Sequence, residues 1–192
     1  MGLLSIWRRS YRDQNGISFP SMNLQIWSAV ATFLLLGVPG LSARHSLDAS
    51  QNSAVTAWLN DHPGYRLARD RDCACDEDLR TIRTAGYGGK WKPIPDYHPY
   101  VVSGDFNGDG VTDFAVVVVD TRKARDFTML VFNGPVDEQQ PVPAFAYQHR
   151  DLTRAGLFYG PPWPKPYRLL VGTFESEGLV LQPRGNTYRL VE

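Results

Sequence analysis

Cysteine and net charge are both scarce in this sequence, and each shortage excludes a kind of site or partner. Only two cysteines occur among 192 residues, and two thiols alone make a poor structural zinc site, which needs four ligands. Twenty basic residues balance twenty acidic ones. Residues 44–192 alone carry 17 basic and 19 acidic groups, a net charge of −2. This balance argues against a nucleic-acid surface and against an anionic membrane partner.

Catalytic sequence motifs are lacking as well. The chain has neither Gly-x-Ser-x-Gly nor His-Glu-x-x-His, the signatures of two large hydrolase classes. His98 and His149 have no nucleophile motif beside them, and structural histidines are the simpler interpretation. Glu175 and Glu177 alternate as a carboxylate pair would, although a solvated turn explains them more simply. We therefore assign no catalytic residue, and an enzyme is the less favoured interpretation.

The chain also lacks a long hydrophobic run. The apolar stretch from Ile26 to Val38 spans about 13 residues, whereas a transmembrane helix needs about 20. Pro39-Gly40 ends it, and small residues precede a cleavage position near Ala43. Residues 1–43 are therefore predicted to be an export signal region, and the protein to be periplasmic or extracellular with no membrane span after cleavage. An uncleaved signal anchor that tethers the chain to a membrane is the alternative.

The start of translation leaves two alternatives open. Arg8, Arg9 and Arg12 supply the positive charge of an export signal if the chain begins at Met1. Met22 is the other candidate start, and the signal then lacks a basic residue.

The two cysteines are separated by a single residue, as Cys73 and Cys75. Export implies an oxidising compartment. A bridge across one residue is strained and uncommon, so free thiols and an intermolecular bond are the alternatives to a local disulfide. We favour the local disulfide.

What the sequence does contain is a loop in which oxygen-bearing side chains recur at every second residue. Asp105, Asn107 and Asp109 alternate, Gly110 permits a sharp turn, and Asp113 follows three residues later. Calcium takes six to eight oxygen ligands from carboxylates, amides, carbonyls and water. We therefore predict one Ca²⁺ site. Its ligands are expected to be Asp105, Asn107, Asp109, the Val111 carbonyl and Asp113, the last directly or through water.

The simpler alternative for this loop is a β-hairpin turn without an ion, because Asn-Gly and Asp-Gly are strong turn formers. We favour the metal site, because a simple turn requires neither the alternation nor Asp113. Zinc does not suit an all-oxygen ligand set. Magnesium competes weakly, since it prefers small octahedral shells rich in water.

The order of ligands follows an EF-hand for nine positions and then departs from it. The twelfth position, a bidentate Glu in EF-hands, is Val116 here, and both flanks are typical of strands rather than helices. The motif resembles the FG-GAP and VCBS-type repeats of extracellular β-rich proteins, whose signature is D-x-[DN]-x-D-G-x-x-D followed by a hydrophobic residue. That resemblance covers about twenty residues around 104–119 and implies a cation bound between two strands. A single copy rules out a complete propeller, which needs at least four blades.

The remaining pattern predicts an α+β fold in one domain, residues 44–192, with an N-terminal helix followed by a largely antiparallel β-sheet. Apolar residues at helical spacing predict a helix over 47–60, capped by Ser46, and 76–83 form one or two helical turns. Strands are expected at 65–68, 100–104, 113–120, 127–132, 144–148, 157–158, 168–173, 178–182 and 187–191. The strand from Val116 to Val119 is apolar at every position, so we expect it to be central with both faces covered.

Two functions remain after these exclusions. The favoured one is an exported calcium-binding module with a structural or a ligand- or protein-binding role. The rigid, proline-rich loop at 161–166 carries Trp163, which is the candidate contact for a protein or glycan ligand. The alternative is a small secreted hydrolase whose active site the sequence does not reveal.

Overall fold

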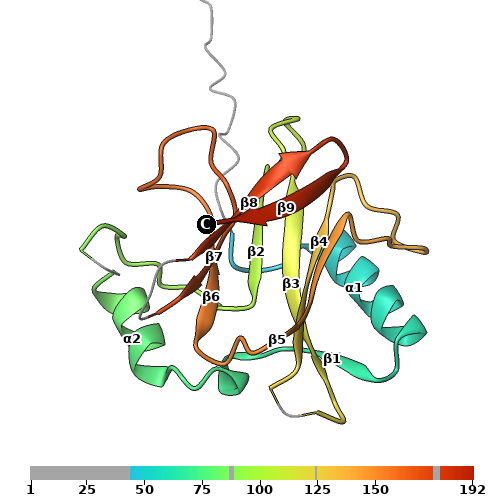
Figure 1. Ribbon diagram of the computed structural model, residues 1–192, viewed down its shortest axis with the longest axis horizontal. Coiled ribbons are helices and arrows are strands. Elements are labelled where there is room, and N and C mark those ends of the chain that lie inside the picture. The colour runs from blue at the N-terminus through green and yellow to red at the C-terminus, as the bar shows by residue number, and fades with distance from the viewer. Residues whose placement is uncertain (1–43, 87–88, 124, 175–177) are drawn as a thin grey trace, which may run out of the picture. The chain divides into compact units, whose positions relative to one another are not determined.

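The computed structural model describes residues 44–192 apart from 87–88, 124 and 175–177, and these belong to one compact unit. The export region predicted at 1–43 lies outside the described residues. The α+β class is confirmed, because N-terminal helices are followed by antiparallel β-structure (Figure 1). The strands form two antiparallel sheets.

Helix α1 spans Ala49–Asp61 and begins two residues later than predicted. Its N-cap is Asp48 rather than Ser46, because the Asp48 carboxylate accepts from the Gln51 amide at 2.9 Å while the Gln51 side chain accepts from the Asp48 amide at 3.1 Å. This capping box satisfies two amides that a helix start leaves unpaired. The buried residues follow helical spacing: Gln51, Ala54, Val55 and Trp58.

Three short elements follow α1. Strand β1 covers Tyr65–Leu67, a 3-10 turn η1 covers Asp70–Asp72, and helix α2 covers Asp76–Thr84. Between η1 and α2, Cys73 and Cys75 form a disulfide with their Cα atoms 5.1 Å apart, within the usual range. The local bridge is therefore the arrangement found. Both cysteines are buried in the larger of two apolar clusters, called the main core from here on, which includes Leu79 of α2.

The first sheet has five strands, and β3 is its central member. The strands after β1 are β2 (Val101–Gly104), β3 (Asp113–Asp120), β4 (Phe127–Phe132) and β5 (Phe145–Arg150). All pairs are antiparallel, in the order β1-β3-β4-β5. Strand β2 pairs with the first half of β3 and β1 with the second half, so both share one edge of β3.

Both faces of β3 are covered, as predicted from its apolar run. Phe114, Val116 and Val118 pack against the buried face of α1. Ala115, Val117 and Val119 face the main core with α2 and the second sheet. Every residue of β3 is buried. Because successive side chains of a strand point to opposite faces, β3 packs against α1 on one face and against the main core on the other.

The second sheet is a four-stranded antiparallel meander. Its strands are β6 (Ala155–Phe158), β7 (Leu170–Thr173), β8 (Leu179–Arg184) and β9 (Thr187–Val191), in that order. The chain leaves the first sheet through the turn after Arg150, where Leu152 enters the main core. Gly185, with φ of +60°, turns β8 into β9. Within the part of the chain described, no helix is long and apolar enough to cross a membrane.

Candidate metal centre

The predicted calcium loop connects two adjacent, paired strands. Strands β2 and β3 are antiparallel neighbours, and Gly104 lies opposite Asp113 in their register. The residues between them therefore form the turn of a hairpin, visible between β2 and β3 in Figure 1. This pairing places the first and the last predicted ligands, Asp105 and Asp113, at the base of the same loop.

Asp105 organises the turn through its carboxylate. Its Oδ1 accepts from the amides of Gly108 at 2.6 Å and Asp109 at 3.1 Å, and its Oδ2 accepts from Gly110 at 3.0 Å. Gly108 and Gly110 both have φ of +85°, a conformation that side chains with a Cβ disfavour. A Cβ added at either glycine would meet no atom within 4 Å. The backbone angle, and not packing, is therefore what requires glycine here.

Asn107 and Asp109 occupy the outer part of the loop. The Asn107 amide group donates to Asp109 Oδ2 at 2.9 Å, and Asp109 Oδ1 accepts from the Val111 amide at 2.8 Å. Asp109 is exposed, Asn107 is half-buried, and Val111 is 38% exposed. These side chains face solvent, so turning their oxygens toward an ion would disturb no packed side chain.

Asp113 is fully buried at the start of β3, and its carboxylate binds backbone amides of the loop. Its Oδ2 accepts from the amides of Phe106 at 2.8 Å and Asn107 at 3.3 Å, and its Oδ1 accepts from Gly134 at 2.9 Å. Burial raises the pKa of Asp113, the three amides oppose this rise, and the nearby charge of Asp109 adds to it. Asp113 therefore joins the predicted calcium loop to the turn that follows β4.

Two tyrosines also support the loop: Tyr159, which directly follows β6, and Tyr188 in β9. The Tyr159 hydroxyl donates to the Asp105 carbonyl at 2.7 Å, and its ring covers Gly104, where a Cβ would come within 2.3 Å of the ring. The Tyr188 hydroxyl lies 2.6 Å from Asn133 Oδ1 and 3.3 Å from Asp113 Oδ2. Burial first, and then the field of the loop carboxylates, raises the pKa of Tyr188. Sequence reasoning missed both tyrosines, because each lies more than fifty residues from its partner.

The chemistry of the donor set fits a hard cation. Asp105, Asp109 and Asp113 are three carboxylates in nine residues, and none forms an ion pair with a basic side chain in the described ranges. Like charges at this spacing repel, and a cation reverses that sign. The five predicted ligands share one loop, but the carboxylates are turned toward its amides. Accordingly, no three His, Cys, Asp or Glu side chains form a preassembled metal cluster among the described residues.

The other residues singled out in the sequence lie apart from this loop. His149 contacts the Asp126 carboxylate at 3.0 Å, and His98 contacts Asp70 at 2.9 Å. Trp163 is 43% exposed and lines a cavity of about 190 Å³. Glu175 lies outside the described residues, as does Glu177.

Comparison of the chain with known proteins finds no matching family model, curated protein or solved structure. The likeness to FG-GAP and VCBS-type repeats therefore remains a resemblance of the loop motif alone.

Proposed function

We propose that this protein is an exported module that binds one Ca²⁺ in the loop between β2 and β3. The observation that carries the proposal is the organised turn, in which the Asp105 carboxylate fixes three amides and both glycines hold positive φ. Such a turn holds the side chains of Asp105, Asn107 and Asp109 close together before an ion binds. The entropy lost in ordering the loop on binding is therefore smaller. The resemblance to FG-GAP and VCBS-type repeats supports the same ion, and the proposed export region supports a calcium-rich location.

The ion's proposed role is structural. The loop contacts both sheets, because Asp113 belongs to β3 of the first sheet and accepts from Tyr188 in β9 of the second. An ion that neutralises the loop carboxylates therefore stabilises the place where the sheets meet. A protein or glycan ligand is proposed at Trp163, whose exposed ring lies beside Pro164, Pro166 and Arg168.

The alternative function, a small secreted hydrolase, has one observation in its favour. His98 and His149 each contact an aspartate, at 2.9 and 3.0 Å, and a carboxylate commonly orients a catalytic histidine. Purified protein assayed on generic ester, peptide and glycan substrates distinguishes the two functions. Turnover that is lost in His98→Ala or His149→Ala would favour the hydrolase.

Calcium binding is tested by calorimetry on chelator-stripped protein. We expect one site, and we expect Asp109→Ala to weaken it by at least about tenfold, because one charged ligand is lost and each 1.4 kcal/mol changes affinity tenfold. Asp137→Ala is the matched control, since Asp137 is another exposed loop aspartate that accepts from backbone amides. Stripped protein that takes up no calcium at millimolar concentration would refute the metal site.

A further inference from the structure

A cavity of about 560 Å³ opens where β1 and β2 separate along the edge of β3. Strand β1 ends at Leu67, opposite Val118, and β2 begins at Val101, opposite Val116. Val117 lies between them and bonds both flanking segments: its carbonyl accepts from Ala68 at 2.9 Å, and its amide donates to Tyr100 at 3.0 Å. The segment after β1 and the segment before β2 separate at Val117, and residues from both segments line the cavity.

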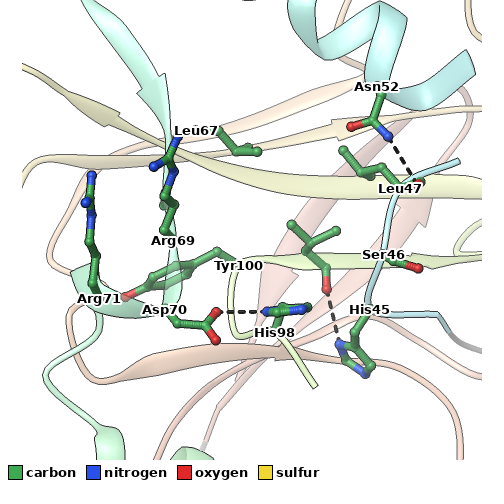
Figure 2. Close-up of a pocket in the computed structure, with 12 residues that line it drawn as sticks. His45, Ser46, Leu47, Asn52, Leu67, Arg69, Asp70, Arg71, His98 and Tyr100 are labelled. Atoms are coloured by element: carbon green, nitrogen blue, oxygen red, sulfur yellow. Dashed lines mark hydrogen bonds and ion pairs between the residues drawn. The ribbon is translucent and has the colours of Figure 1, made fainter. Parts of the chain in front are cut away.

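One wall of the cavity is rich in positive charge. Arg69, Asp70 and Arg71 line it from η1 and the residue before it, and His98 lines it from the segment before β2 (Figure 2). Asp70 is already engaged, since it forms an ion pair with Arg83 and accepts from His98 Nδ1 at 2.9 Å. Its negative charge is therefore largely compensated before a ligand enters.

Neighbouring acidic groups are engaged elsewhere too. Arg66 holds Asp72 through two bonds of 2.6 and 2.7 Å. Arg69 and Arg71, by contrast, form no ion pair within the described ranges. Two exposed guanidinium groups, neither of them ion-paired among the residues that the structure describes, thus line one cavity. Arginine is the residue best suited to bind carboxylate or phosphate oxygens, because its fork of donors matches them.

The rest of the cavity is mostly apolar and open to solvent. Leu47 and Leu67 line it (Figure 2), and Val101 lines it as well. His45 lies beneath, 3% exposed, and donates from Nδ1 to the Val101 carbonyl at 3.1 Å. Burial lowers the pKa of His45, so its ring adds no charge to this wall at neutral pH. A ligand that fits both walls has an anionic head and a compact apolar body.

We propose that this cavity binds a small organic anion, with its carboxylate or phosphate against Arg69 and Arg71 and its apolar body against Leu47, Leu67 and Val101. His98 borders the same wall with its side chain 52% exposed and its Nδ1 committed to Asp70. Its other ring nitrogen, Nε2, is therefore the one that remains for the head group of a ligand. None of the residues of the predicted calcium loop lines this cavity, so the anion site and the calcium site can be tested independently.

The test is an NMR titration of the full chain with three probes of similar size: benzoate, phenyl phosphate and benzyl alcohol. We expect both anions to shift the amides of residues 69–71, His98, Tyr100 and Val101, with saturation in the millimolar range or below and weaker binding as salt is raised. Benzyl alcohol, which has the apolar body without the charge, should bind at least about tenfold more weakly. The same result in the presence of a calcium chelator shows independence from the metal site.

Arg69→Gln and Arg71→Gln should each weaken benzoate about tenfold, because each removes one charge-assisted contact. Arg184→Gln is the matched control: this arginine is exposed at the end of β8 and forms no ion pair within the described ranges. Unchanged melting temperatures of the variants show that the fold is intact. Equal binding of benzyl alcohol and benzoate, equal binding by wild type and both cavity variants, or no shifts at 69–71, His98, Tyr100 and Val101 would overturn the proposal.

Discussion

Asp113 shows how one residue can serve the fold while standing in a predicted metal site. Its position fits the ligand pattern, and its carboxylate also accepts three backbone amides in a fully buried place. A buried acceptor that is lost leaves its donors without partners, and this costs more than the bond itself contributes. The residue is therefore constrained by folding before any ion is considered.

Replacing Asp113 by Asn tests this role. The amide keeps one acceptor oxygen and presents two N–H groups to backbone amides that already donate, so we expect a loss of about 2–3 kcal/mol in the free energy of unfolding. Urea unfolding in the presence of chelator measures it without a metal contribution. The matched control is Asp137→Asn, on an exposed loop, which should change stability by less than about 0.5 kcal/mol. Similar losses for both variants would contradict the anchoring role.

At the level of single residues, the sequence predicts the ligands of the loop but not the tyrosines that contact it from elsewhere in the fold. The alternation of Asp105, Asn107 and Asp109 is local, and the chemistry follows from the residue types alone. Tyr188 reaches the loop from β9 and Tyr159 from the residue after β6, and nothing in their sequence neighbourhoods indicates these contacts. The cavity beside Arg69 and Arg71 is hidden for the same reason, because it depends on where two distant strands separate.

Among the elements, strand positions are the most predictable feature of this chain. Apolar runs bounded by Gly, Pro and Asn mark nearly every strand to within two or three residues, and β3 is central for the reason that its composition indicates. The division into two sheets is not encoded locally, since it depends on which strand edges meet. The start of α1 was misplaced because Ser46 and Asp48 are both good caps, and only the capping box with Gln51 decides between them.

The contact between β1 and η1 depends on a bidentate pair, Arg66 with Asp72, and this makes it sensitive to acid. The hydrogen bonds from Arg66 hold the pKa of Asp72 below its usual value, burial opposes them, and the Arg69 amide adds to the lowering. A carboxyl whose folded pKa is depressed stabilises the fold above its unfolded pKa of about 3.9. That contribution is lost as the pH falls through the folded value.

We therefore expect Asp72→Asn to lower the free energy of unfolding by about 1 kcal/mol at pH 7, a modest loss because the pair is partly exposed. At a pH below the folded pKa of Asp72, the substitution should change the free energy of unfolding very little. Urea unfolding of both proteins at pH 7 and near pH 2 gives the comparison. Asp61→Asn at the exposed end of α1 is the control. A difference between wild type and Asp72→Asn that is the same at both pH values would show that the ion pair is not its cause.

For the whole molecule, export is the first property to test. The apolar run of residues 26–38 followed by Pro39-Gly40 predicts cleavage near Ala43. Intact-mass measurement of protein recovered from the source cells should give a chain that begins at or close to Arg44. Full-length chain in the soluble cytosolic fraction would refute export. Full-length chain in the membrane fraction would instead support the uncleaved anchor.

Calcium is expected to act on the stability of the whole molecule, because its loop contacts both sheets. An ion that binds only the folded state stabilises it by RT ln(1 + [L]/Kd), about 2.7 kcal/mol at a hundredfold excess over Kd. For a domain of this size that corresponds to a rise in melting temperature of about 5–10 °C. Thermal unfolding with calcium and with chelator measures the shift within each protein, so any intrinsic effect of a substitution cancels.

Asp105→Ala should abolish that shift, because it removes both a ligand and the carboxylate that fixes the turn. Asp137→Ala should retain it, since Asp137 lies in a different loop, beyond β4. If wild type melts at the same temperature with calcium and with chelator, the structural role is wrong even where calorimetry detects weak binding. If Asp105→Ala keeps the full shift, the ion binds elsewhere on the chain, and the loop's alternation then reflects only the turn that Asp105, Gly108 and Gly110 form.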